Sequence, residues 1–180
     1  MSRMAAVLIA VLVSLSLVAA VSAGSVHLKG GKNAEPSFTD NGLSLTASGE
    51  LSGLGNGDVL ISIDATADVT ANCTNPGDQS KVPGQNPAPI NVTGSTSIPA
   101  SEVKNGNTPF SVTTTEVPSA IPGAPDCPNP GWSENILDLA FTSATITVEQ
   151  PVGTVVLTVT CTFSPATSDG PVSKADVSCT

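Results

Sequence analysis

Val59-Leu-Ile-Ser-Ile-Asp-Ala-Thr-Ala-Asp-Val-Thr-Ala-Asn-Cys73 is the stretch that decides the fold of this 180-residue chain. Every second residue from Val59 to Cys73 is apolar, and polar residues fill all the intervening positions except Leu60. Successive side chains of a β-strand point to opposite faces, whereas a helix would scatter this pattern around its circumference. The stretch therefore predicts a long strand with one buried face.

The segment before this strand alternates in the same way. Residues 43–51 carry apolar side chains and one glycine at odd positions, and a glycine-rich connection, Gly53-Leu-Gly-Asn-Gly-Asp58, follows them. Glycine and asparagine tolerate the positive φ angles that tight turns require. We therefore expect segments 43–51 and 59–73 to form a β-hairpin.

A second hairpin is predicted near the C-terminus. Segments 136–150 and 154–163 both alternate, and Gln150-Pro-Val-Gly153 supplies a turn between them. In the first segment the apolar positions switch from odd numbers (Leu137, Leu139, Phe141) to even numbers (Ala144, Ile146, Val148). A change of phase in a strand requires one extra residue, which predicts a β-bulge near Thr142–Ser143.

Two weaker strands complete the prediction. They lie at 90–98 and 110–115, with Asn105-Gly106 turn chemistry between them. Six strands with hairpin-like spacing indicate an all-β fold, an antiparallel β-sandwich of six to eight strands. Trp132 lies far beyond the position that an immunoglobulin domain gives its tryptophan after the first bridge cysteine, so a true immunoglobulin domain is excluded.

The N-terminus has the three parts of a secretory signal. Arg3 precedes an apolar run that ends in the small residues Val21-Ser22-Ala23. We expect residues 1–23 to be removed, which leaves 24–180 as a single domain whose residues 24–37 form a flexible N-terminal segment. The alternative is an uncleaved signal that anchors the protein, because no charge occurs between Arg3 and Lys29.

All four cysteines, Cys73, Cys127, Cys161 and Cys179, lie after this signal. An even number of cysteines in an exported chain predicts two disulfide bonds, for which three pairings are possible. In a simple meander, strand direction brings Cys73 and Cys127 to one end of the sandwich. We therefore favour the pairs Cys73–Cys127 and Cys161–Cys179 over the other two pairings.

Two proline-rich loops, at 74–89 and 116–131, are the expected contact surface. The same turn marks both, in Cys73-Thr-Asn-Pro-Gly77 and Cys127-Pro-Asn-Pro-Gly131, and Pro-Gly suits the centre of a type II turn. Trp132 follows the second turn as either an exposed ligand contact or a buried plug of the core. Loops on a rigid scaffold commonly carry recognition, so we expect this end to bind the partner.

Composition excludes several functions. The chain has 15 acidic and 6 basic residues, a formal charge of −9, and so lacks the basic clusters that bind nucleic acid. There is no Gly-x-Ser-x-Gly elbow, and the single histidine, His27, lies near the expected N-terminus of the processed chain, which disfavours a serine triad. A carboxylate-dependent hydrolase, for example of the glycosidase type, needs only Asp and Glu and stays open.

Metal sites are equally restricted. No Cys-x-x-Cys pair accompanies the lone histidine, so a zinc site is not expected. A structural calcium ion is the one cofactor left open, because Asp58 in the glycine-rich loop offers oxygen ligands, with Asp64 and Asp68 on the following strand. Asp64 and Asp68 lie about 13 Å apart along a strand and cannot share one ion.

These observations favour a secreted, extracellular, non-catalytic binding, surface or structural module. Its expected partner is an extracellular protein or a glycan, and a membrane only if the signal stays uncleaved. The alternative is the carboxylate-dependent secreted hydrolase on the same scaffold.

Overall fold

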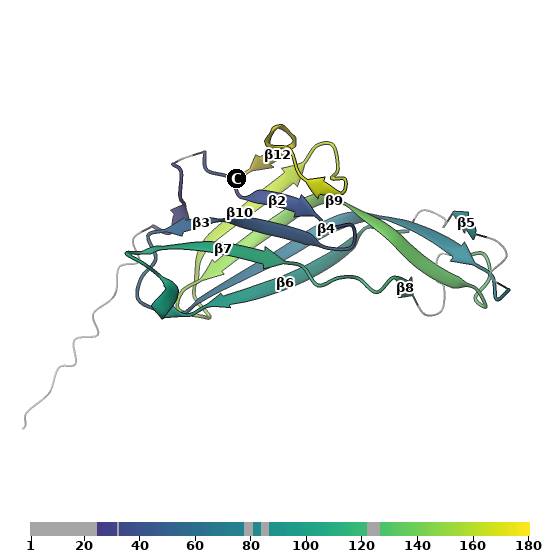
Figure 1. Ribbon diagram of the computed structural model, residues 1–180, viewed down its shortest axis with the longest axis horizontal. Coiled ribbons are helices and arrows are strands. Elements are labelled where there is room, and N and C mark those ends of the chain that lie inside the picture. The colour runs from purple at the N-terminus through teal and green to yellow at the C-terminus, as the bar shows by residue number, and fades with distance from the viewer. Residues whose placement is uncertain (1–24, 32, 78–80, 84–86, 122–126) are drawn as a thin grey trace, which may run out of the picture.

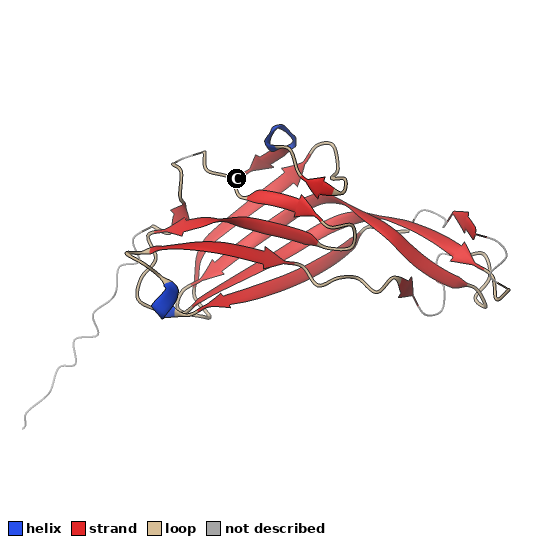
Figure 2. Cartoon of the chain, viewed as in Figure 1, coloured by secondary structure: helices blue, strands red, loops and turns tan. Residues whose placement is uncertain are grey.

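The computed structural model describes residues 25–31, 33–77, 81–83, 87–121 and 127–180. Its strands form two antiparallel sheets, and these residues contain no α-helix (Figures 1 and 2). Two short 3₁₀ segments, Ala100–Glu102 (η1) and Lys174–Asp176 (η2), are the helical turns of this part of the chain. The predicted all-β, sandwich-like fold is confirmed, and its two sheets stay open. No helix among the described residues is long and apolar enough to cross a bilayer.

The smaller sheet is built around β3 (Leu45–Ser52). Strand β7 (Asn107–Thr113) pairs along one edge of β3, while β2 (Ser37–Asp40) and β1 (His27–Leu28) share the other edge. Strand β11 (Gly170–Pro171) extends the sheet beyond β2. All these pairings are antiparallel, although only β2 and β3 follow each other directly in the chain.

The larger sheet is built on the two longest strands, β4 (Val59–Thr74) and β9 (Ser133–Glu149), which pair from Leu60 to Thr74 of β4. Its other strands are β6 (Ile90–Ile98) and β5 (Lys81–Pro83) on the outer edge of β4, β10 (Val155–Phe163) and β8 (Ala120–Ile121) on the outer edge of β9, and β12 (Val177–Cys179) beyond β10. The six strands expected from the sequence are the six longest in the structure.

The core lies between the two sheets and follows the alternation read from the sequence. The odd-numbered residues Val59 to Ala67 of β4 are at most 1% exposed, and the residues between them face solvent at least in part. Phe38 of β2 and Phe163 of β10 join the sheets edge to face, with ring centroids 4.9 Å apart. Alternating burial thus fixes which face of each sheet points inward.

The hairpin expected between 43–51 and 59–73 is not formed. Strand β3 lies in the smaller sheet and β4 in the larger one, so the connection passes from one sheet to the other instead of turning within a sheet. Leu54 in that connection is 7% exposed, and the Gln150 side chain bonds the backbone of Gly55 and Gly57 at 2.6–3.0 Å. Alternation reports one buried face but not the sheet to which it belongs, which is why the prediction was wrong.

Strands β6 and β7 also belong to different sheets, so the simple meander used to place the cysteines does not exist. The Asn105-Gly106 turn does form, with φ of 51° and 75°, and closes Lys104 onto Asn107 through bonds of 2.8 and 2.9 Å. This turn lies after η1 and begins β7. It therefore redirects the chain into the other sheet.

The second hairpin and its bulge are confirmed. Strands β9 and β10 pair antiparallel around Gln150–Gly153. Thr66 of β4 lies opposite Ser143, and Ala67 lies opposite Phe141, so Thr142 is the extra residue. The bulge moves the buried positions of β9 from odd to even numbers, as the sequence predicted.

The sequence prediction for β9 missed a second bulge. A register shift between Thr70 and Ala71 of β4 makes Leu137 an extra residue. Leu137 is 55% exposed, whereas its neighbours Ile136 and Leu139 are buried. The expected grouping of Leu137 with the buried odd positions is therefore wrong.

Residues 24–37, predicted to be flexible, include β1 and the first residue of β2, and residues 24 and 32 lie outside the described residues. Residues His27 and Leu28 form β1 against the end of β3, and the backbone N–H of Lys29 donates to the Glu50 carbonyl at 2.8 Å. Val26 and Leu28 are 6% and 8% exposed. Their apolar side chains bury against the core, which explains why this segment joins the sheet. The expected signal, residues 1–23, lies outside the described residues.

A distal arm as candidate binding site

The C-terminal part of β4 and the N-terminal part of β9, which pair with each other, project beyond the smaller sheet and form an arm (Figure 1). We define this distal arm as residues 69–77 and 127–137 together with strands β5 and β8, which pair along its two edges. Residues 41–44 form the turn between β2 and β3 of the smaller sheet. This turn contacts β9 at the base of the arm, where the backbone N–H of Leu139 donates to the Gly42 carbonyl at 2.9 Å. Beyond that point the arm consists of four strands of the larger sheet alone.

A disulfide bond between Cys73 and Cys127 ties the proline-rich loops together at this arm. The second bond joins Cys161 of β10 to Cys179 of β12, which lie directly opposite each other. Both pairs are those that the sequence favoured. Cys73 meets Cys127 because β9 begins beside the end of β4, with Glu134 opposite Cys73, and not because of a meander.

Trp132 lies on this arm and is partly exposed, outside the main hydrophobic core. The backbone N–H of Trp132 donates to the Asn129 carbonyl at 3.0 Å, which closes a turn around Pro130-Gly131. Gly131 lacks the positive φ that a type II turn requires, so that part of the prediction is wrong. The Asn129 side chain instead accepts the Gly131 N–H at 2.9 Å.

The arm carries a polar hollow of about 450 Å³ on the face that bears exposed Leu137. At its floor the Asn135 side chain donates to Asn72 Oδ1 at 3.2 Å and to Thr74 Oγ1 at 3.1 Å. Amides and hydroxyls both donate and accept hydrogen bonds. The hollow therefore combines groups that bind peptide or sugar with one exposed apolar side chain.

Glu134, which was not among the residues predicted from the sequence, is fully buried on the opposite face of the arm. It lies between Cys73 of β4 and Ile121 of β8 in the pairing register. Because it stands two residues before buried Ile136, the alternation of β9 places it on the inward face. That parity is the signal by which the sequence shows its burial.

A second group of acids surrounds the 41–44 turn. Asp40 is 2% exposed, accepts the Thr167 hydroxyl at 2.5 Å and the Gly42 N–H at 2.9 Å. Burial raises the pKa of Asp40, the hydrogen bonds from Thr167 and Gly42 oppose that rise, and the charges of Asp138 and Asp169 add to it. These three aspartates come from distant segments of the chain, so no local sequence pattern indicates that they lie together.

The calcium candidates do not come together. Asp58 accepts the Ala100 N–H at 2.9 Å and so holds the start of η1. Asp64 and Asp68 are exposed on the outer face of β4. Among the described residues no three His, Cys, Asp or Glu side chains are arranged to hold a metal ion.

Fold and site together define a two-sheet, disulfide-bonded all-β domain with a projecting arm. Two disulfides are typical of proteins that reside in an oxidising environment. Comparison with protein-family models, with curated proteins and with solved structures found no match to this chain.

Proposed function

We propose that the protein is exported and acts outside the cell as a non-catalytic binding or surface module. The two disulfides and the signal-like residues 1–23 support export. The partner we propose is an extracellular protein or a glycan, contacted through the distal arm.

One observation carries this proposal: the arm presents the described parts of both proline-rich loops, joined by the Cys73–Cys127 disulfide, at one end of a long β-ribbon. Loops held on a rigid scaffold commonly carry recognition. Leu137 and Trp132 add exposed apolar surface beside the hydrogen-bonding groups of Asn135. Aromatic and apolar anchors beside polar groups are the usual composition of a binding surface.

The experiment compares arm variants with a matched control. Labelled protein is applied to a glycan array and to the extracellular proteins of the producing cells. Leu137→Ser and Trp132→Ala are expected to weaken binding at least tenfold. Val152→Ser is the control, because Val152 is 58% exposed and Leu137 is 55% exposed, but Val152 lies in the β9–β10 turn away from the arm.

Intrinsic fluorescence locates the binding independently. The chain has one Trp and no Tyr, so its emission reports Trp132 alone. A partner that binds the arm changes this emission in the Val152→Ser protein as in the unaltered one. Equal loss of binding in the Val152→Ser and Leu137→Ser proteins would contradict the proposal.

The second candidate is the carboxylate-dependent hydrolase. The observation that favours it is the approach of two carboxylates at the 41–44 turn. Oδ1 of Asp169 and Oδ1 of Asp138 lie 3.4 and 3.9 Å from the Cβ position of Gly42. Release of reducing sugar from polysaccharides, abolished in Asp138→Asn and Asp169→Asn, would favour this function over binding.

A further inference from the structure

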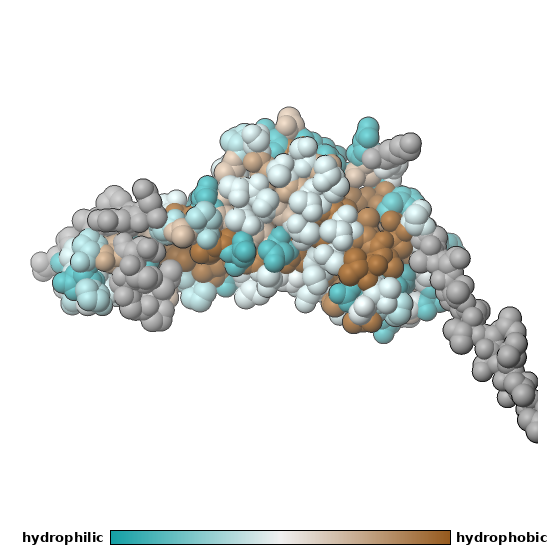
Figure 3. Space-filling model, turned by 180° about the vertical axis from the view of Figure 1, so that it is seen from behind, coloured by the Kyte–Doolittle hydropathy of each residue, from teal (hydrophilic) through white to brown (hydrophobic). Residues whose placement is uncertain are grey.

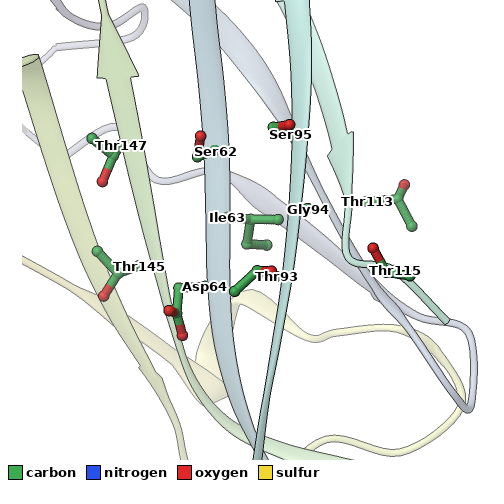
Figure 4. Close-up of a pocket in the computed structure, with 10 residues that line it drawn as sticks. All are labelled: Ser62, Ile63, Asp64, Thr93, Gly94, Ser95, Thr113, Thr115, Thr145 and Thr147. Atoms are coloured by element: carbon green, nitrogen blue, oxygen red, sulfur yellow. The ribbon is translucent and has the colours of Figure 1, made fainter. Parts of the chain in front are cut away.

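The outer face of the larger sheet carries a trough of about 550 Å³, and seven of its ten lining residues are Ser or Thr (Figure 4). Two rows of side chains cross it. Ser95, Ser62 and Thr147 form one row, because Ser62 pairs with the other two across β6, β4 and β9. Thr93, Asp64 and Thr145 form the next row by the same pairing.

The spacing of these groups is regular. Neighbouring strands lie about 4.8 Å apart, and residues two apart on one strand lie about 6.7 Å apart. The sheet thus presents a grid of hydroxyl oxygens with one carboxylate, Asp64, on its central strand. Figure 4 shows Asp64 between Thr93 and Thr145.

The far wall of the trough comes from the other sheet. The Thr115 N–H donates to the Thr93 carbonyl at 2.8 Å, which places the end of β7 and the residues after it beside β6. Gly94 makes this approach possible, since a Cβ there would meet the Thr113 carbonyl oxygen at 1.9 Å. The trough is therefore a product of the fold and has a defined wall.

The polar groups of the trough are available to a ligand. Within the described part of the chain, the side chains of Ser62, Ser95, Thr147 and Asp64 make no hydrogen bond to protein. Thr145 shares its hydroxyl with Thr160 at 3.3 Å. Each free hydroxyl can donate one hydrogen bond and accept two.

We propose that this trough binds a neutral saccharide. Sugar hydroxyls both donate and accept, as do the Ser and Thr side chains of the two rows, and a carboxylate accepts from two sugar hydroxyls at once. No Lys or Arg lines the trough, which disfavours phosphate, sulfate or uronate ligands, and Ile63 is the one large apolar residue in its lining, which disfavours lipid. This site lies apart from the distal arm and does not depend on it.

The test is a titration of the exported protein with neutral gluco-, manno- and galacto-oligosaccharides. Binding is monitored by the amide chemical shifts in NMR spectra. Shifts are expected at Ser62, Asp64 and Thr147. Asp64→Asn and Thr147→Val are expected to weaken binding at least tenfold. Thr162→Val removes an exposed hydroxyl from β10 outside the trough and is expected to leave affinity unchanged.

Circular dichroism and thermal unfolding first establish that each variant folds. Leu137→Ser separates this site from the arm, because it is expected to retain saccharide shifts at the trough. The inference would be overturned by no shift at the trough with 10 mM of any of these oligosaccharides, by unchanged affinity in Thr147→Val, or by binding of anionic saccharides only. Growth inhibition or reshaping of ice crystals without saccharide binding would assign the hydroxyl grid to ordered water instead and would also overturn it.

Discussion

Gly94 brings a strand of the larger sheet against the backbone of the smaller one. A Cβ atom at this position would lie 1.9 Å from the Thr113 carbonyl oxygen and 2.7 Å from its carbonyl carbon. These are backbone atoms, so relief requires β6 and β7 to move apart. Overpacking costs about 1–3 kcal/mol, and we expect Gly94→Ala to lower the free energy of unfolding by about 3 kcal/mol. Urea denaturation followed by circular dichroism measures this loss.

Gly57→Ala is the control for that substitution. Its Cβ would meet Gln150 Cγ at 3.6 Å, an ordinary contact, and Gly57 does not have a positive φ. We expect Gly57→Ala to change the free energy of unfolding by no more than about 0.5 kcal/mol. Equal stability of the Gly94→Ala and Gly57→Ala proteins would show that the two sheets do not meet at Gly94.

Asp40 makes stability depend on pH. Burial, the largest cause, raises its pKa in the folded protein, which therefore binds the proton more tightly than the unfolded chain does. The tighter proton binding stabilises the folded protein. This stabilisation is complete below the ordinary Asp pKa of about 3.9 and is lost as pH rises through the raised pKa. Asp40→Asn is expected to remove this loss of stability with rising pH. The difference in unfolding free energy between the two proteins therefore changes between the ordinary and the raised pKa of Asp40.

Denaturation at a series of pH values from about 3 to 8 measures the effect of Asp40. Asp68→Asn removes the same charge from the exposed face of β4 and controls for net charge. A constant difference between Asp40→Asn and the unaltered protein at every pH would contradict the prediction.

At the scale of elements, alternation predicted the strands better than their partners. The six long strands follow from apolar residues at every second position, and the Thr142 bulge follows from the change of phase within β9, because a buried face must repeat every second residue. The destination of β3 does not follow, since a strand of either sheet buries one face. Leu54 was the missed signal: an apolar residue inside a glycine-rich turn is buried when the connection passes from one sheet to the other.

The two disulfides stabilise different elements. Cys161 belongs to the main core, whereas Cys73 is buried in the arm outside it. Sequence separations of 54 and 18 correspond to losses of about 4 and about 3 kcal/mol on removal, by loop-closure entropy. We expect Cys73→Ser with Cys127→Ser to change Trp132 emission in the native protein, and Cys161→Ser with Cys179→Ser to leave that emission unchanged.

Emission spectra and urea transitions of both double variants measure these losses. The second double variant is the control for the first, since each removes one bond between a buried and a partly exposed cysteine. Unchanged Trp132 emission in the first variant would mean that the disulfide does not determine the conformation around Trp132.

The whole molecule is elongated because its sheets differ in length. Strands β4 and β9 have 16 and 17 residues, whereas β2 and β3 of the smaller sheet have 4 and 8. At about 3.3 Å per residue, β4 spans about 53 Å, and the smaller sheet covers only part of it. The space-filling view shows pale, polar surface over much of the body, with hydrophobic surface beside the arm and, more extensively, toward the opposite end (Figure 3).

The arm itself was only partly predictable. Two loops that share a cysteine-proline turn indicated a common end, and the preferred pairing of Cys73 with Cys127 put them there. The projection of β4 beyond its partner sheet depends on where β2 and β3 stop, and their sequences resemble those of other half-buried strands. Likewise the trough depends on a contact between sheets at Gly94, which no local pattern reports.

We predict that export shortens the chain by removing residues 1–23. If residues 1–23 are a signal, the protein recovered outside the producing cell begins at Gly24, because signal peptidase requires small residues such as Val21-Ser22-Ala23 before the cut. Alkylation without reduction adds no mass to it, because all four cysteines are paired. Ala23→Arg is expected to block cleavage and leave the precursor membrane-bound. Intact-mass measurement decides: a product of the full 17.9 kDa would identify an anchor, and alkylated thiols would rule out an oxidised, exported protein.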